Sequence, residues 1–179
     1  MKVECWQTYQ ELDANRSLAA FHAGDVDDAW RLLRREAEVD RPVYERLLSE
    51  GLDFARIRLV QFPLTQYLRY EILNYLIRHE MGETIEMVVL PAGVRLPGGE
   101  LFDFLLFDEA CALIHDYGDD GLQRGGWVTT TPEVLRALSA TVRDLRSRAV
   151  PLGRFLESHP DCRSDDQPVT VDQTRSTAG

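Results

Sequence analysis

The segment 56-RIRLVQFPLTQYLRYE-71 decides the fold, because it changes from a strand pattern to a helix pattern within one short stretch. Residues 56–62 alternate in polarity, which predicts a β-strand with one mostly apolar face. The opposite face carries Arg56 and Arg58. Pro63 cannot donate a ladder hydrogen bond and ends the strand. The segment therefore predicts a strand that presents two guanidinium groups side by side.

A helix is predicted directly after this strand. From Leu64 onwards apolar side chains recur every three or four residues, and Gly82 supplies a helix stop. The next apolar run, 84-TIEMVVL-90, is typical of a buried strand. A strand joined to its successor through a full helix forms a βαβ unit, so we expect the two strands to be parallel.

The remaining periodic segments flank this βαβ unit. Before it, two amphipathic helices are predicted at residues 24–38 and 42–51. After it, the pattern predicts an antiparallel hairpin within 100–117, an edge strand at 124–131, a long helix from Pro132 and a shorter helix at 152–156. We therefore expect an α+β (mixed α/β) fold, in which flanking N- and C-terminal helices accompany a central mixed sheet of about four to five strands.

Length and composition fit one folded unit. The chain has 179 residues, and 44% of them are hydrophobic, which suffices for one core. We expect a single globular domain over residues 1–158, with a helical N-terminal part at 1–51, a sheet core at 52–131 and C-terminal helices at 132–158. Residues 159–179 are polar and lack periodicity, so they are predicted to form a disordered tail.

Charge and cysteine content restrict the compartment and the partners. With 20 basic and 30 acidic residues the formal net charge is −10, which disfavours direct binding of nucleic acid or of an anionic membrane. Cys5, Cys111 and Cys162 are widely spaced and odd in number, which favours reduced thiols over disulfides or a zinc site. No apolar run approaches the roughly 18 residues of a membrane-spanning helix. We expect a cytoplasmic protein.

Arg56 and Arg58 are the first candidate ligand-binding residues. Two guanidinium groups on one strand face can recognise a carboxylate or a phosphate through bidentate hydrogen bonds. The alternative is that both arginines form ion pairs with some of the 30 acidic residues. The spacing alone leaves open an anion cradle, an ion-pair scaffold and a solvated face.

Polar residues of the following helix are candidates for the same site. Tyr67 and Glu71 are four residues apart, as are Tyr70 and Asn74, so each pair shares a helix face. Together with Arg69, this helix would contribute hydrogen-bond donors, a phenol and a carboxylate. The alternative is an exposed helix face with surface ion pairs.

Three further carboxylates lie beside apolar runs. Glu83 follows the helix, and Asp103 and Asp108 belong to the first half of the predicted hairpin. A buried Asp103 needs a partner, and an arginine of the first strand is a candidate for that partner. Such a pair fits a structural role as well as a catalytic one.

Known catalytic and cofactor motifs are absent from the sequence. The four histidines have no metal-binding spacing, and neither a glycine-rich nucleotide loop nor a GxSxG elbow is present. Cys111 lies within an apolar run, which favours a core thiol over a nucleophile. We therefore expect no cofactor and no metal, and no residue stands out as catalytic.

The same residues resemble the motif of an actinobacterial family of unknown function, whose members are often encoded beside helix-turn-helix regulators. The family pattern runs Arg-x-Arg, Pro, Ser/Thr, Tyr-x-Arg-aromatic-Glu, Gly-Glu and Asp-Phe-aromatic-apolar-Phe-Asp. The matching residues are Arg56, Arg58, Pro63, Thr65, Tyr67, Arg69, Tyr70, Glu71, Gly82, Glu83, Asp103, Phe104, Phe107 and Asp108. The resemblance covers residues 52–156, and Leu105 departs from it at the second aromatic position.

The order of elements also resembles, more weakly, one half of a phospholipase-D-like domain, which occurs as a noncatalytic sensor in some regulators. Catalytic members of that group need His-x-Lys-x4-Asp. When Asp108 is aligned with the final aspartate, Leu101 stands at the histidine and Asp103 at the lysine. The resemblance therefore implies no phosphodiester cleavage by that mechanism.

Three functional hypotheses follow. The first is a noncatalytic regulatory or ligand-sensing domain that acts with a helix-turn-helix regulator in development or secondary metabolism. The alternative is a transferase-like small-molecule enzyme of specialised metabolism, in which Arg56 and Arg58 hold an anionic substrate. Tyr67, Glu71 or Glu83 would then move a proton. The third is a dimerising scaffold with a large apolar patch.

Overall fold

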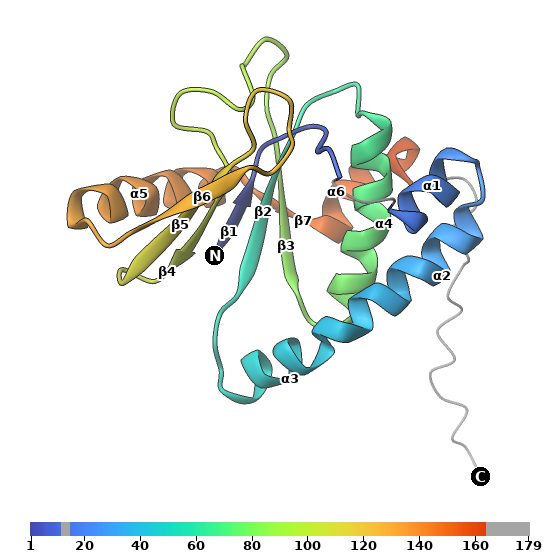
Figure 1. Cartoon of the computed structure of the whole chain (residues 1–179), viewed down its shortest axis with the longest axis horizontal. Helices are drawn as coiled ribbons and strands as arrows, with labels where there is room; N and C mark the ends of the chain where they lie inside the picture. The colour runs from blue at the N-terminus through green and yellow to red at the C-terminus, as the bar shows by residue number, and fades with distance from the viewer. Residues whose placement is uncertain (12–14, 164–179) are drawn as a thin grey trace.

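The structure of the protein, a computed structural model, describes residues 1–11 and 15–163 (Figure 1). Its strands are β1 (Lys2–Glu4), β2 (Ala55–Val60), β3 (Thr84–Val89), β4 (Phe104–Phe107), β5 (Cys111–Asp116), β6 (Gly125–Thr129) and β7 (Val150–Pro151). Its α-helices are α1 (Arg16–His22), α2 (Val26–Ala37), α3 (Arg41–Ser49), α4 (Gln66–Glu80), α5 (Pro132–Arg148) and α6 (Leu152–Ser158). Short 3₁₀ helices span Glu38–Asp40 and Pro160–Cys162. The mixed α+β class agrees with the prediction.

The strands form one seven-stranded mixed sheet in the order β6-β5-β4-β1-β2-β3-β7. The neighbours β1–β2 and β2–β3 are parallel, and the other neighbouring pairs are antiparallel. The unit β2–α4–β3 confirms the predicted crossover, and β4 and β5 form the predicted hairpin. The prediction of a smaller sheet is wrong. β1 has three residues and β7 has two, which is too few for a periodic pattern.

The short elements also change the predicted division of the chain. β1 belongs to the sheet although it lies in the part predicted as helical, 1–51. β7 belongs to the sheet although it lies outside the predicted sheet core, 52–131. The predicted tail includes Pro160–Cys162, which form a helical turn whose Cys162 side chain is buried. The ordered chain therefore extends past residue 159, and residues 164–179 lie outside the described residues.

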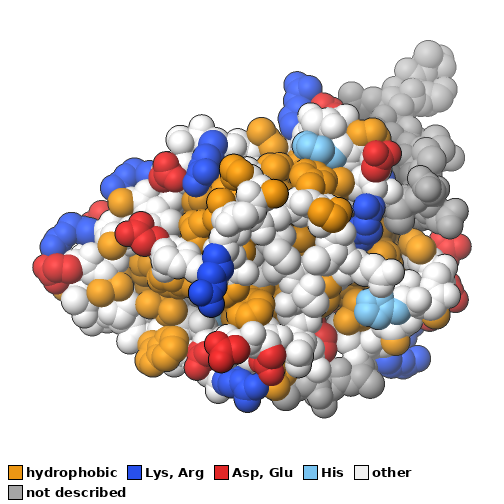
Figure 2. Space-filling model, turned by 90° about the horizontal axis from the view of Figure 1, so that it is seen from above, with side chains coloured by type: hydrophobic (Ala, Val, Ile, Leu, Met, Phe, Trp, Pro, Cys, Tyr) orange, Lys and Arg blue, Asp and Glu red, His pale blue; other side chains and the backbone are white. Residues whose placement is uncertain are grey.

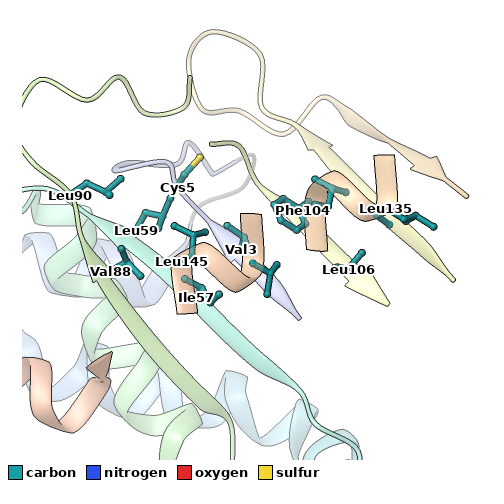
Figure 3. Close-up of a cluster of buried hydrophobic side chains, with 13 residues drawn as sticks. Val3, Cys5, Ile57, Leu59, Val88, Leu90, Phe104, Leu106, Leu135 and Leu145 are labelled. Atoms are coloured by element: carbon teal, nitrogen blue, oxygen red, sulfur yellow. The ribbon is translucent and has the colours of Figure 1, made fainter. Parts of the chain in front are cut away.

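Helix α5 covers one face of the sheet through a buried apolar cluster (Figure 3). Alternation along the strands places Val3, Ile57, Leu59 and Phe104 on this face, and Leu145 of α5 packs against them. Each fully buried side chain of this kind stabilises the fold by roughly 1.5–3 kcal/mol before entropy is counted. The predicted long amphipathic helix from Pro132 is confirmed, and its apolar stripe forms this core.

Helices α4 and α6 cover the other face of the sheet, and α2 packs against the outer side of α4 (Figure 1). Helix α4 buries apolar side chains on two sides. Leu68 and Ile72 belong to the cluster beside the sheet. Leu73 and Ile77 belong to the cluster shared with α2. A polar strip of α4 faces the polar side chains of β1 and β2.

The end of the sheet where β1, β2 and β3 finish is seen from above in Figure 2. Hydrophobic side chains gather near the middle of this face, and charged side chains of both signs lie mostly nearer its margin. This mixture differs from the uniformly basic face that nucleic acids bind. Among the described residues, no helix is long and apolar enough to cross a bilayer.

Candidate functional site

Arg56 lies in a buried ion-pair network between the sheet and α4. The parallel register places Lys2 of β1 beside it, and its guanidinium lies 5.2 Å from the centre of the Tyr75 ring of α4. Arg56 Nη1 lies 2.7 Å from Glu4 Oε1, and Arg56 Nε lies 2.7 Å from Glu83 Oε1. Two of the three guanidinium nitrogens therefore bind carboxylates of the protein itself.

Both carboxylates have further partners. Glu4 accepts a hydrogen bond from the Tyr75 hydroxyl at 2.9 Å and pairs with Lys2 at 2.7 Å. Glu83 accepts a hydrogen bond from the Tyr44 hydroxyl at 2.5 Å. Burial alone would raise the pKa of Glu4, but the charges of the neighbouring arginine and lysine hold that pKa well below its ordinary value. Glu4 therefore stays ionised at neutral pH and ties β1 to β2 and α4.

Arg58 is fully buried two residues further along β2. Its Nη2 donates a hydrogen bond to the Trp6 carbonyl, and its guanidinium lies 5.5 Å from the centre of the Tyr9 ring. Its Nε and Nη1 have no hydrogen-bond partner within residues 1–11 and 15–163. Tyr9 lines the cavity described below and Arg58 does not, so the guanidinium lies behind the tyrosine ring.

Asp103 is buried and is held by groups other than arginine. Its Oδ1 accepts hydrogen bonds from the Cys5 amide and from the Cys5 thiol, each at 2.9 Å, and its Oδ2 accepts one from the Tyr9 hydroxyl. No ion pair joins Asp103 to an arginine in the part of the chain that the structure describes. The expected arginine partner is thus replaced by Cys5 and Tyr9, which connect Asp103 to the segment after β1.

A cavity of about 590 Å³ lies between the polar face of the sheet and α4. Lys2, Glu4 and Arg56 of the strands line it, together with Tyr9 and Tyr117 from the segments that follow β1 and β5. Within the described part of the chain, three basic and four acidic side chains contribute to the lining, and the others can donate or accept hydrogen bonds. The cavity is therefore polar, and its volume lies within the range of about 300–1,000 Å³ typical of small-molecule sites.

One strip of α4 forms the wall opposite the sheet. Tyr67, Glu71, Asn74 and Arg78 recur at intervals of four, three and four residues, so they share one helix face. The Tyr67 hydroxyl donates a hydrogen bond to Glu11 at 3.0 Å. Arg78 Nε donates one to Asn74 Oδ1 at 3.1 Å. Three of the four side chains in this strip therefore have partners within the protein.

Glu71 is the exception in this strip. It is 8% exposed and lines the cavity, but its side chain makes no hydrogen bond or ion pair with a residue that the structure describes. Burial raises the pKa of Glu71, the charge of Glu4 raises it further, and the charges of Arg56 and Arg58 offset this only in part. Its carboxylate oxygens are not among the fully enclosed unpaired atoms of the described residues, so they remain accessible from the cavity. Glu71 is therefore a hydrogen-bonding group that the fold leaves available to the cavity.

The profile of one protein family matches residues 1–157 of the chain, and that family is described as a domain of unknown function (DUF6879). The chain belongs to this family. The matched range includes β1, so it covers Glu4 as well as the arginine strand and α4. No curated protein and no solved structure matches the chain. Membership of DUF6879 therefore establishes a family but not a reaction.

The DUF6879 domain brings together several residues that were predicted from the sequence. Arg56, Tyr67, Glu71 and Asn74 all line the cavity. Glu83 lies behind Arg56 and holds its guanidinium. These residues come from β2, from α4 and from the residue before β3, so one βαβ unit supplies them all. Arg58 and Asp103 do not line the cavity but contact Tyr9, which does: Arg58 lies over the Tyr9 ring, and Asp103 accepts a hydrogen bond from the Tyr9 hydroxyl.

Two predicted residues lie elsewhere in the DUF6879 domain. Arg69 points away from the polar strip of α4, and its Nη1 donates a hydrogen bond to the Asp161 carbonyl at 2.6 Å. Asp108 is exposed in the turn between β4 and β5, where its φ is 50°. Neither residue lines the cavity. Arg69 and Asp108 were candidate ligand-binding residues, and the cavity does not include them.

Sequence reasoning missed several residues of the cavity. Lys2, Glu4 and Tyr9 belong to β1 and the segment after it, and β1 is too short for a test of periodicity. The alternation of polar and apolar residues in 2-KVEC-5 was the one signal of this strand. Arg78 was also missed, although it continues the strip of Glu71 by two helical turns.

Proposed function

We propose that this DUF6879 domain is a noncatalytic ligand-sensing domain whose cavity binds a small molecule with a polar group that contacts Glu71. The observation that carries the proposal is the position of this carboxyl group. Glu71 is 8% exposed, faces a cavity of about 590 Å³ and has no partner among the described residues. A ligand that donates a hydrogen bond would give this carboxyl group a partner within the cavity.

The buried arginines support this site as a scaffold. Arg56 is held between Glu4 and Glu83, and Arg58 lies behind Tyr9. Breaking buried ion pairs of this kind costs several kcal/mol, so a ligand has little to gain by displacing the internal carboxylates. This geometry favours the ion-pair scaffold over the anion cradle. The Glu71 carboxyl group is therefore a better candidate for ligand binding than the paired arginines.

The regulatory part of the proposal concerns a partner. The family resemblance connects this motif with helix-turn-helix regulators, and the net charge of −10 suits a basic protein partner. The segment after β1 offers a route from the ligand to the surface. Tyr9 lines the cavity and is bonded to Asp103, so occupancy of the cavity would bias the position of this segment.

Native mass spectrometry of the protein, isolated gently from the lysate of an actinobacterial host, tests the proposal. We expect a small-molecule adduct on the wild type that is lost from Glu71→Gln. Glu45→Gln is the matched control, because Glu45 is an exposed glutamate of α3 outside the cavity. An adduct that is retained by Glu71→Gln, or no adduct on any of the three proteins, contradicts the proposal. A protein of regulator size that co-purifies with the wild type and with both variants would support the proposed regulatory partner.

A second candidate is an enzyme of the transferase-like class, and one observation favours it. The pKa of Glu71 is raised by burial, and a carboxyl group with a raised pKa in a cavity suits general acid–base catalysis. Incubation of the adduct-bearing protein with lysate metabolites separates the two functions. A sensor keeps its ligand chemically unchanged. An enzyme converts it, and Glu71→Gln would then slow the conversion more than the binding.

A further inference from the structure

A second, mainly apolar cavity adjoins the polar one. It has a volume of about 430 Å³ and lies between α3 and the strands β4 and β5. Val43 and Leu47 of α3 and Leu105 and Phe107 of β4 supply much of its lining. Val43 is 55% exposed and Phe107 is 51% exposed, so water covers large apolar side chains here. We call this second cavity the apolar groove.

The apolar groove is continuous in position with the polar cavity. Four side chains line both of them: Lys2, Asp40, Arg56 and Arg78. The cations at this boundary already have partners, because Lys2 and Arg56 pair with Glu4, and Arg78 pairs with Asp40 at 2.8 Å. The boundary is therefore close to neutral, and the aliphatic stems of its long side chains can contact an apolar group.

The two cavities are arranged along α4. Glu71 and Arg78 are seven residues apart on the same helix face, which corresponds to about 10 Å along the helix axis. Glu71 lies in the polar cavity, and Arg78 lies at the entrance to the apolar groove. A ligand that occupies both must therefore carry its polar group and its apolar end roughly 10 Å apart.

We propose that the ligand of this domain is an amphipathic cation, whose protonated amine binds Glu71 and whose apolar end occupies the apolar groove. This inference rests on the proposed ligand-sensing function and specifies the class of ligand. Among the described residues, four carboxylates and three cations line the polar cavity, which leaves one negative charge in excess when Glu71 is ionised. An ammonium group gives a charge-assisted hydrogen bond to Glu71 and neutralises that excess. The rings of Tyr9, Tyr67 and Tyr117 also favour a cation nearby.

Isothermal titration calorimetry with simple amines tests the two parts of this inference. The probes are butylammonium and decylammonium, with decanoate and decanol as anionic and neutral compounds of matched length, all kept below their aggregation concentrations. An alkyl chain whose amine binds Glu71 reaches the apolar groove only when it is longer than about 10 Å. We therefore expect decylammonium to bind at least about tenfold more tightly than butylammonium, and more tightly than decanoate or decanol.

Variants separate the amine site from the groove. Glu71→Gln should weaken decylammonium binding by about tenfold to a hundredfold, and the exposed control Glu45→Gln should leave it unchanged. The double variant Val43→Ser/Phe107→Ser should weaken decylammonium binding without affecting butylammonium. Val39→Ser is its control, because Val39 is 78% exposed and lies outside the groove.

The outcomes distinguish a failure of this inference from a failure of the proposed function. Equal affinity for butylammonium and decylammonium overturns the role of the groove. Preferential binding of decanoate or decanol overturns the cationic class. In either case a Glu71-dependent adduct in native mass spectrometry keeps the sensing function in place. When no probe binds and no such adduct exists, both proposals are overturned.

Discussion

Arg56 Nε of β2 lies 2.7 Å from Oε1 of Glu83, the residue that immediately precedes β3. The Glu83 side chain has no exposed surface, and the same guanidinium group also binds Glu4 of β1. One cation therefore joins two carboxylates across the three parallel strands, of which β1 and β2 line the cavity. This arrangement explains why a charged residue occupies the buried face of β2, and it leaves Glu71 as the open group above.

Replacing Arg56 with methionine should destabilise the protein strongly. The change leaves Glu4 and Glu83 buried without their cation, so we expect the free energy of unfolding to fall by about 3–5 kcal/mol. Urea denaturation at neutral pH measures this loss. Arg136→Met is the matched control, because Arg136 forms an exposed pair with Glu133 and should change the free energy by less than about 1 kcal/mol. Similar losses in both variants would contradict the scaffold role.

Glu71 and Glu4 should give opposite pH dependences of stability. The pKa of Glu71 is raised by burial and by Glu4, with opposing contributions from Arg56, Arg58 and Lys2. The stability linked to Glu71 is therefore fully present below the ordinary glutamate pKa of 4.5, and it is lost as the pH rises through the folded-state pKa. The pKa of Glu4 is lowered, so its contribution is present above 4.5 and is lost as the pH falls.

The variant Glu71→Gln isolates the first of these effects. Because glutamine carries no charge, we expect the variant to gain stability relative to the wild type as the pH rises above the ordinary glutamate pKa. Urea midpoints between about pH 4.5 and pH 7.5 measure the difference. Glu45→Gln should show a nearly constant difference, since Glu45 is exposed. A constant difference for Glu71→Gln as well would argue against a buried carboxyl group.

The three free thiols should differ in reactivity. Cys5 is 0% exposed, and burial followed by the charge of Asp103 raises the pKa of its thiol. Cys162 is 3% exposed, whereas Cys111 is partly exposed at the start of β5. We expect a maleimide to label one thiol rapidly in the native protein and Cys111→Ser to abolish the rapid reaction. Rapid labelling that persists in Cys111→Ser would contradict the buried positions of the other two.

The sequence predicted the β2–α4–β3 unit because both strands and the helix are long enough to show their periods. Alternation along 56–62 and a spacing of three or four residues after Pro63 are independent signals that agree. β1 could not be predicted in the same way, because a strand of three residues depends on its neighbours β2 and β4 for its formation. Its position at the centre of the sheet is a property of the tertiary fold.

The candidate site was predictable in part for the same reason. Tyr67, Glu71 and Asn74 share a helix face by spacing alone, and the structure places them on one wall of the cavity. The hydrogen-bond or ion-pair partner of each charged side chain was not predictable from the sequence. Asp103 bonds to Cys5 across 98 residues of sequence, and no local pattern encodes such a contact. Asp108 was a candidate because it lies beside an apolar run, but the structure places it in the exposed turn between β4 and β5.

The central claim is that Glu71 is an open, buried carboxyl group that recognises a cation. The most direct measurement is an NMR titration of its carboxyl carbon, with the resonance assigned from Glu71→Gln, in the absence and presence of decylammonium. We predict a pKa above the ordinary glutamate value in the free protein and a lower pKa when the cation is bound. An ordinary pKa that decylammonium leaves unchanged would contradict the claim.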